Sequence, residues 1–208
     1  MADVMELASA ERADLAQFLA TLTPQQWQAP SLCEGWRVRD VVAHVVSYDE
    51  LDAAGLARRL LRGRFLLGRA NAAGVIDYAQ HSPQQLLELL HRSLRPRGLT
   101  AVFGGRIGLL DAMIHQQDIR RPLGLARDVP AERLRVALDF ARNAPPIGAP
   151  WRIRGLRLVA TDLDWATGHG DEVRGRAESL LMAMAGRRGI VDELTGAGQH
   201  TLAGRTGG

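Results

Sequence analysis

The sequence has 208 residues, which suits one sizeable domain or one domain with a small appendage. Hydrophobic residues make up 46% and charged residues 24%, the composition of an ordinary globular protein. No apolar run reaches the ~18 residues that a membrane span needs. The N-terminus is acidic and amphipathic rather than basic and then apolar, which argues against a signal peptide and predicts a cytoplasmic protein with no membrane partner.

The net charge is only +3, and every cationic residue of the chain is an arginine. A nucleic-acid surface combines clustered cations with stacking aromatic residues, and aromatic residues are only 5% of this chain. We therefore expect no nucleic-acid partner. The densest basic stretch, at Arg62, Arg64 and Arg69, is interpreted as a solvated helix end or loop.

Apolar residues at helical spacing predict that the first two thirds of the chain are helical. Two short signals support this, because Thr23 and Ser82 are each followed by Pro and, three residues after the cap, by Gln, which is typical of a helix N-terminus. The expected helices cover residues 3–22, 24–27, 37–62, 82–94, 103–120 and 130–142.

The composition changes at residues 143–150, a stretch rich in Pro, Gly and Ala that is the best linker candidate. Leu156, Leu158 and Ala160 then alternate with polar residues, as in a half-buried strand. The segment is too small to own a large core, so we expect it to pack against the helical part. The predicted domains are residues 1–142 (helical) and 151–208 (small, α/β). Within the second, the pattern predicts a strand near 172–176, helices at 177–185 and 190–194, and a frayed end over the last ten residues.

Two polar residues share one face of the helix predicted at 103–120. Asp111 and His115 are four positions apart, so their side chains project from successive turns, next to Ile114. An acid and a histidine among apolar side chains are costly to bury unless something binds them, and a divalent metal is one such partner. A pair that simply faces solvent is the alternative, because polar pairs at this spacing are common.

His44 lies on the apolar side of the preceding long helix, where a structural histidine at the edge of the core is the alternative to a ligand. Helix bundles build metal sites from side chains on facing helices. His44, Asp111 and His115 would give three protein ligands and leave one position open, as in a catalytic site. Asp118, one turn further on, is expected to orient His115 or a metal-bound water, or to pair with a neighbouring arginine.

The single cysteine excludes an intrachain disulfide and any multi-cysteine zinc site, so a metal is expected to be held by histidines and carboxylates. Cys33 itself is expected to be a small buried residue, since no base partner is recognisable in the sequence. Trp36 and Trp165 are interpreted as core anchors.

Four segments together resemble a known family. They are residues 31–44 (SLCEGWRVRDVVAH), 111–124 (DAMIHQQDIRRPLG), 155–162 (GLRLVATD) and 173–187. In this order they resemble the mycothiol-dependent maleylpyruvate isomerase family of the DinB-like superfamily, over nearly the whole chain.

The resemblance implies a mainly α fold, a DinB-like four-helix bundle with a small C-terminal α/β segment. It implies a divalent metal, usually zinc, held by His44, Asp111 and His115, and mycothiol, the low-molecular-weight thiol of actinobacteria, as cofactor or co-substrate. The family pattern has Glu, one methylene longer, at the position of Asp111. The resemblance also leads us to expect a C-terminal segment shorter than that of the isomerase.

The function that follows is a metal-dependent thiol transferase or isomerase, in which the metal activates a small thiol towards an electrophilic substrate. Five arginines are candidates for recognising carboxylates on the thiol or the substrate: Arg62, Arg64, Arg106, Arg120 and Arg121. The alternatives are a non-catalytic DinB-like metal-binding or stress-response protein, and a ligand carrier with a hydrophobic pocket in the α/β segment.

Overall fold

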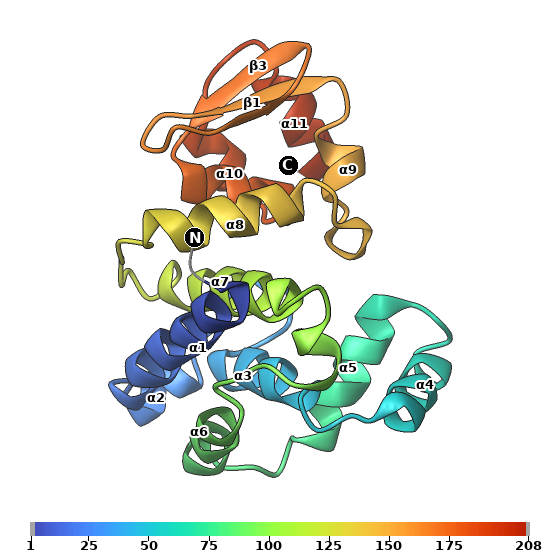
Figure 1. Ribbon diagram of the computed structural model, residues 1–208. Helices are drawn as coiled ribbons and strands as arrows, with labels where there is room; N and C mark the ends of the chain where they lie inside the picture. The colour runs from blue at the N-terminus through green and yellow to red at the C-terminus, as the bar shows by residue number, and fades with distance from the viewer. Residues whose placement is uncertain (1–2, 207–208) are drawn as a thin grey trace. The chain divides into compact units, whose positions relative to one another are not determined.

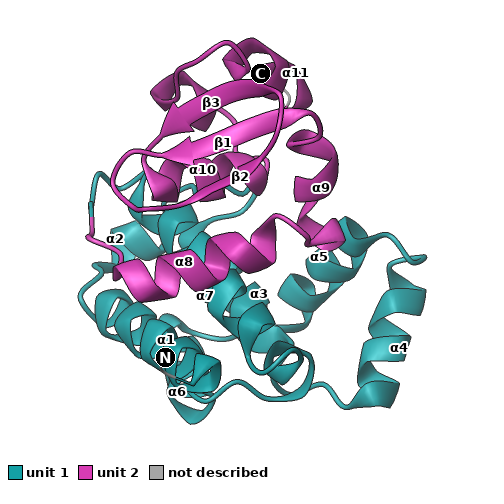
Figure 2. Cartoon of the chain, turned by 45° about the horizontal axis from the view of Figure 1, so that its top comes forward, with its two compact units in different colours: residues 1–126 teal, residues 127–208 magenta. Residues whose placement is uncertain are grey.

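The computed structural model describes residues 3–206 and divides the chain into two compact units, residues 1–126 and 127–208 (Figure 2). The described part of the first unit is built from helices. They are α1 (Val4–Ala20), α2 (Pro24–Trp27), α3 (Val38–Ser47), α4 (Ala53–Arg62), α5 (Leu67–Asp77), α6 (Pro83–Arg92), the 3₁₀ helix η1 (Gly98–Ala101) and α7 (Arg106–Arg120).

Helices α1, α3, α6 and α7 pack against one another and enclose the core of this unit (Figure 1). All four contribute fully buried apolar side chains, among them Leu15, Leu19, Val38, Val41, Val42, Leu86, Leu90, Ala112 and Ile119. The predicted four-helix bundle is confirmed, and so is the mainly α fold class. The apolar periodicity of the sequence therefore marked the faces that meet in this core.

Two helix starts form as their local sequences predict. The Thr23 side chain accepts from the backbone N–H of Gln26 at 3.2 Å, while the Gln26 side chain accepts from the Thr23 N–H at 2.9 Å. Ser82 and Gln85 repeat this reciprocal pair at the start of α6. Such capping boxes satisfy orphan N–H groups with side chains only three residues away, so they can be recognised without any tertiary information.

The single helix expected at 37–62 is wrong, because the chain forms two helices there. α3 ends at Ser47, and Asp52 begins α4 by accepting the Gly55 N–H at 2.6 Å. This cap stabilises a new helix start where apolar spacing alone indicated continuity. The arginine-rich turn beyond α4 is exposed as predicted, whereas α5 follows where no helix was expected.

The second unit combines helices with a small sheet. Its elements are α8 (Ala131–Ala141), η2 (Pro145–Ile147), α9 (Ala149–Arg152), β1 (Leu156–Ala160), β2 (Ala166–Gly168), β3 (Asp171–Gly175), α10 (Ala177–Met184), η3 (Ile190–Glu193) and α11 (Gln199–Thr206). The strand order is β2-β1-β3, with β1 antiparallel to β2 and parallel to β3.

The predicted inward alternation of β1 is confirmed, since Leu156, Leu158 and Ala160 are all buried. The frayed end expected over the last ten residues is wrong for the described residues 199–206, which form α11. Leu202 is fully buried on this helix, so it has an apolar anchor.

The predicted linker, residues 143–150, contains the short helices η2 and α9 and falls inside the second unit. The unit boundary lies earlier, after Ala126, because α8 packs on α10. The predicted domains 1–142 and 151–208 stay a prediction.

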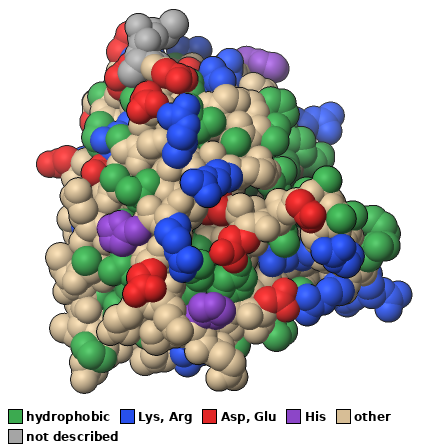
Figure 3. All heavy atoms as spheres, turned by 60° about the horizontal axis from the view of Figure 1, so that its bottom comes forward, with side chains coloured by type: hydrophobic (Ala, Val, Ile, Leu, Met, Phe, Trp, Pro, Cys, Tyr) green, Lys and Arg blue, Asp and Glu red, His purple; other side chains and the backbone are tan. Residues whose placement is uncertain are grey.

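Among residues 3–206, no helix is both long and apolar enough to cross a membrane. On the face drawn in Figure 3, cationic and acidic side chains are interspersed over most of the surface, and cationic ones gather mainly at one edge. This mixture agrees with the small net charge of the chain.

Candidate metal centre

The helix that carries the predicted Asp-x3-His pair begins at a glycine that the fold requires. Gly105, immediately before α7, has φ +88°, and a Cβ on it would lie 3.2 Å from the Cα of Met5 in α1. A side chain here would therefore be both strained and crowded. The close approach fixes the start of α7 against α1.

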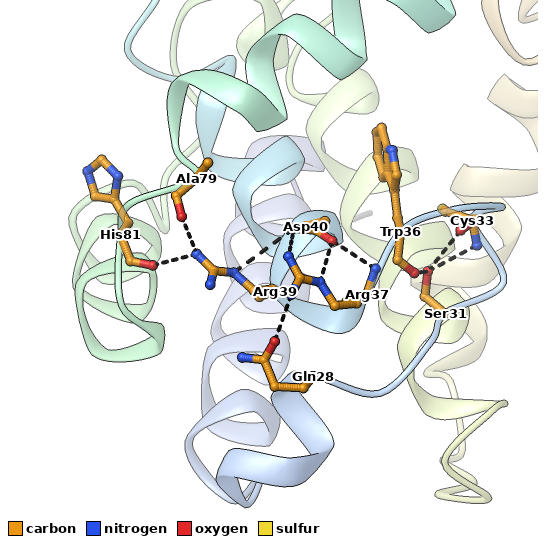
Figure 4. A network of polar contacts seen from close by, with 9 residues as sticks. All are labelled: Gln28, Ser31, Cys33, Trp36, Arg37, Arg39, Asp40, Ala79 and His81. Atoms are coloured by element: carbon orange, nitrogen blue, oxygen red, sulfur yellow. Dashed lines mark hydrogen bonds and ion pairs between the residues drawn. The ribbon is translucent and has the colours of Figure 1, made fainter.

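The start of α3, which carries the third predicted ligand, is fixed by a polar network (Figure 4). Asp40 accepts from the backbone N–H of Arg37 at 3.0 Å and from its Nε at 3.0 Å. Arg39 donates to the carbonyl oxygens of Ala79 and His81 at 2.7 and 2.9 Å. The network thus ties the helix start to the segment that follows α5.

The structure brings the three predicted ligands together. Asp111 Oδ1 lies 3.6 Å from His44 Nε2 and 3.4 Å from His115 Nε2, and the donor atoms all lie within 4.8 Å of one another. Two ligands of a tetrahedral zinc ion are separated by about 3.4 Å, given bond lengths near 2.0–2.1 Å. The donor set therefore fits a divalent metal, and ligation by these residues stays a prediction.

The centre is buried on its histidine side and open on its carboxylate side. His44 and His115 are 5% and 8% exposed, whereas the Asp111 side chain is 24% exposed. Burial by itself would raise the pKa of Asp111, but the charge and hydrogen bonding of His115, together with His44, hold that pKa well below its usual value.

The opposite shift occurs on His115. Burial by itself would lower its pKa, but the Asp111 charge and hydrogen bonds to Asp111, Asp118 and Cys33 raise the pKa well above the ordinary 6.5. The two opposite pKa shifts both favour an ion pair between the Asp111 carboxylate and the His115 imidazolium.

Asp118 supports His115 from behind. Its side chain is fully buried, and Oδ2 lies 2.8 Å from His115 Nδ1. A carboxylate on the far nitrogen of a metal-binding histidine fixes the ring orientation and the tautomer that presents Nε2 to the metal. Of the two roles predicted for Asp118, the structure describes this contact with His115.

Cys33 is the residue that sequence reasoning missed. Its side chain is half-buried rather than buried, Sγ donates to Asp118 Oδ2 at 3.1 Å, and Sγ lies 3.8 Å from His115 Nδ1. The sequence offered one weak signal, the position of Cys33 in the loop directly before the metal-site helix.

Aromatic side chains flank His44. The ring of Trp36 lies 5.3 Å from the imidazole centroid at 48°, and that of Tyr48 lies 5.6 Å away in an edge-on arrangement. Tyr48 donates to Asn71 Oδ1 at 2.6 Å, and burial raises its pKa in spite of nearby Arg59. Trp36, expected to be a core anchor, is half-buried and packs on the site, and Tyr48 was not predicted at all.

Three of the five candidate arginines make described contacts elsewhere. Arg62 pairs with Asp77, Arg106 donates to the carbonyl of Phe103, and Arg120 stacks over the Phe18 ring. None of these contacts involves a metal-site residue. Carboxylate recognition by the five arginines stays a prediction.

Comparison with known proteins identifies relatives. The family model described as the mycothiol maleylpyruvate isomerase N-terminal domain matches residues 8–98, a range that includes His44 but ends before Asp111. Two solved structures are similar in fold, the mycothiol-dependent maleylpyruvate isomerase (TM-score 0.55, 16% identity) and its histidine-to-alanine mutant (TM-score 0.61, 18% identity). Each alignment covers 93% of this chain and 91% of the other. Among curated proteins, none matches the chain significantly.

Proposed function

We propose that this chain, which belongs through residues 8–98 to the mycothiol-dependent maleylpyruvate isomerase family, is a cytoplasmic metalloenzyme that uses mycothiol against a small electrophilic substrate. The observation that carries the proposal is the convergence of His44 Nε2, Asp111 Oδ1 and His115 Nε2 at one edge of an apolar bundle core. Zinc is the metal that we propose, because two imidazoles and a carboxylate are among its usual ligands.

His44, Asp111 and His115 would hold the ion, and three protein ligands leave a position open for a substrate atom. The family pattern has the longer Glu at position 111, yet the Asp111 carboxylate lies within 3.6 Å of both imidazoles. A bound divalent ion lowers the pKa of a thiol that coordinates to it and so supplies a thiolate at neutral pH.

The chain's own residues orient and enclose this chemistry. Asp118 accepts from His115 Nδ1 and keeps Nε2 directed at Asp111. Trp36 and Tyr48 restrict the access of water to His44. The partly exposed Asp111 marks the side from which a thiol and an electrophile can enter.

Two outcomes are open to a thiolate that is formed here. In a transfer, sulfur bonds to the electrophilic carbon, and either a leaving group departs or a proton completes the adduct. In an isomerisation, sulfur adds to a conjugated double bond, the new single bond rotates, and expulsion of the thiol restores the double bond in its other geometry.

The test is turnover of mycothiol with a chromogenic electrophile and with a cis-configured conjugated keto acid, measured beside the metal content of the protein. We expect about one metal ion per chain and turnover that a chelator abolishes. His44→Ala and His115→Ala should each lose turnover, and His115→Ala should also lose the metal. His91→Ala is the matched control, because it removes an exposed imidazole on α6.

Full metal occupancy without turnover on any electrophile would favour the non-catalytic metal-binding alternative. Chelator-insensitive turnover that disappears in Cys33→Ser would instead make the protein thiol the nucleophile. Lipid that co-purifies with a metal-free protein would favour the ligand carrier.

A further inference from the structure

A second set of metal-ligand atoms lies on the other side of the His115 ring. Cys33 Sγ, His115 Nδ1 and Asp118 Oδ2 form a triangle with edges of 3.1, 2.8 and 3.8 Å, and each atom belongs to a ligand class that zinc accepts. The first set uses Nε2 of the same imidazole. One histidine therefore stands between two three-donor groups.

The triangle is close to the size that a metal ion needs. With metal–sulfur bonds of about 2.3 Å and bonds to nitrogen or oxygen of about 2.0–2.2 Å, tetrahedral edges are about 3.4–3.6 Å. The edge between Asp118 and His115 and the edge between Asp118 and Cys33 would each lengthen by about half an ångström. The third edge, between Cys33 and His115, is already near this range.

Backbone contacts hold Cys33 beside α7. The Leu32 N–H donates to the backbone carbonyl of Asp118 at 3.0 Å, and the Trp36 N–H donates to the carbonyl of Cys33 at 2.9 Å. The Ser31 hydroxyl accepts from the Cys33 N–H at 3.1 Å and closes the same loop (Figure 4). These hydrogen bonds of the loop therefore hold the Cys33 thiol in place beside α7.

The geometry points to a second metal site at Cys33, His115 and Asp118 that takes a thiophilic divalent cation such as zinc or cadmium. Sulfur distinguishes this set from the first one, since thiolate ligands favour soft ions over oxygen-preferring ones. The inference concerns binding alone and does not require the chain to be an enzyme.

Occupation of the second site changes the protonation of its ligands. The ion takes the positions of the protons on Sγ and Nδ1, which are released to solvent, and the imidazole keeps its proton on Nε2 beside Asp111. The first site needs the Nε2 lone pair instead. A neutral imidazole offers one lone pair at a time, so the two sites exclude each other and binding saturates at one ion per chain.

The experiment is a titration of metal-free protein with Cd²⁺ in thiol-free buffer, followed by the ultraviolet charge-transfer absorption of a cadmium–thiolate bond. We expect the band in the wild type, with saturation near one ion per chain. His44→Ala removes a donor from the first site only and should keep the band. Cys33→Ser should lose it, and His115→Ala should lose or greatly weaken it.

Far-UV circular dichroism of each variant controls for folding, and Cys33→Ala provides a second variant without sulfur. A wild-type protein that binds Cd²⁺ without the band would overturn the proposal. A band lost equally in His44→Ala would also overturn it, because Cys33 would then belong to one common site. Failure of the proposed enzyme activity is a separate result, since it leaves the Cd²⁺ band unaffected.

Discussion

Arg12 and His115 each pair with a carboxylate of the first unit, but the two clusters balance the negative charge of that carboxylate in different ways. Arg12 is fully buried, and its Nη1 donates to Asp49 Oδ2 at 2.8 Å and to the Ser93 carbonyl at 2.6 Å. Thr100 donates to the other oxygen of Asp49 at 2.7 Å. Here the chain itself supplies both a permanent cation and an anion.

In the candidate metal centre, the Asp111 carboxylate is instead paired with two imidazoles, those of His44 and His115. His115 neutralises Asp111 only by carrying an extra proton, and the raised pKa of His115 records this demand. An arginine keeps its proton under all ordinary conditions, whereas a histidine can give it up to make room for another cation. The comparison supports the proposal that the His115 cluster, whose partners can release a proton, binds a metal, and that the Arg12 cluster is structural.

The largest expected effect is on metal binding in His115→Ala. This change removes a donor from the centre, so metal affinity should fall by more than the roughly 100-fold that loss of a supporting residue costs. The measurement is equilibrium dialysis followed by elemental analysis. If His115→Ala kept the metal content of the wild type, His115 would not be a ligand, and the two clusters would not differ as proposed.

The second prediction addresses the structural cluster. Arg12→Met leaves Asp49 buried without its cation and should lower the free energy of unfolding by about 3–5 kcal/mol, with metal affinity unchanged. Arg12→Lys should cost less, because among the described residues Nη1 alone of the guanidinium nitrogens has a partner.

Denaturant unfolding of the metal-free variants gives these values. Arg12→Met combined with Asp49→Asn should recover part of the loss, since no buried charge is then left unpaired. A stable Arg12→Met protein that no longer binds metal would reverse the assignment of the two clusters.

The elements predicted correctly are those whose signals are local. Each of these signals depends on residues within a few turns of chain. Examples are the capping boxes at Thr23 and Ser82 and the apolar face of α7. The break between α3 and α4 was missed because Asp52 caps a helix where apolar residues continue on both sides. Helix propensity and apolar periodicity alone do not predict whether such a stretch forms one helix or two.

In the candidate site, too, the residues predicted from the sequence are those with local signals. Helical spacing placed Asp111 beside His115, and the apolar arc of α3 pointed His44 inwards. The place of Cys33 in the site was not predicted, because its contact with Asp118 depends on how the 31–36 loop folds back over α7. The two residues are 85 positions apart in the sequence. Nothing in the spacing of the sequence encodes that approach.

The third prediction tests the support of His115. Asp118→Asn keeps the shape of the side chain but removes the carboxylate that accepts from Nδ1, so metal affinity should fall by about 10–100-fold. Asp49→Asn is the matched control, because it makes the same change in the structural cluster and should leave metal affinity unaltered. Equal affinities in the two variants would exclude a supporting role for Asp118.

The smallest expected effect is the pH dependence of metal affinity. The metal needs the Nε2 lone pair of His115, and the raised pKa places a proton there even above the ordinary value of 6.5. Below the folded pKa of His115, binding must expel this proton, so affinity should fall about tenfold for each pH unit of acidification. Asp111 adds nothing to the slope near neutrality, since its lowered pKa keeps it ionised.

Competition with a chromogenic chelator across the neutral range measures this slope, and calorimetry in buffers of different ionisation enthalpy counts the proton released. The Arg12 cluster should respond in stability instead. Burial raises the pKa of Asp49 above 3.8 despite Arg12, so the folded protein binds that proton more tightly than the unfolded chain. Stability from this group is therefore present below 3.8 and declines as the pH rises through its folded pKa. A metal affinity that stays flat down to pH 6.5 would mean that His115 is neutral in the metal-free protein, and the two clusters would then differ in geometry but not in charge.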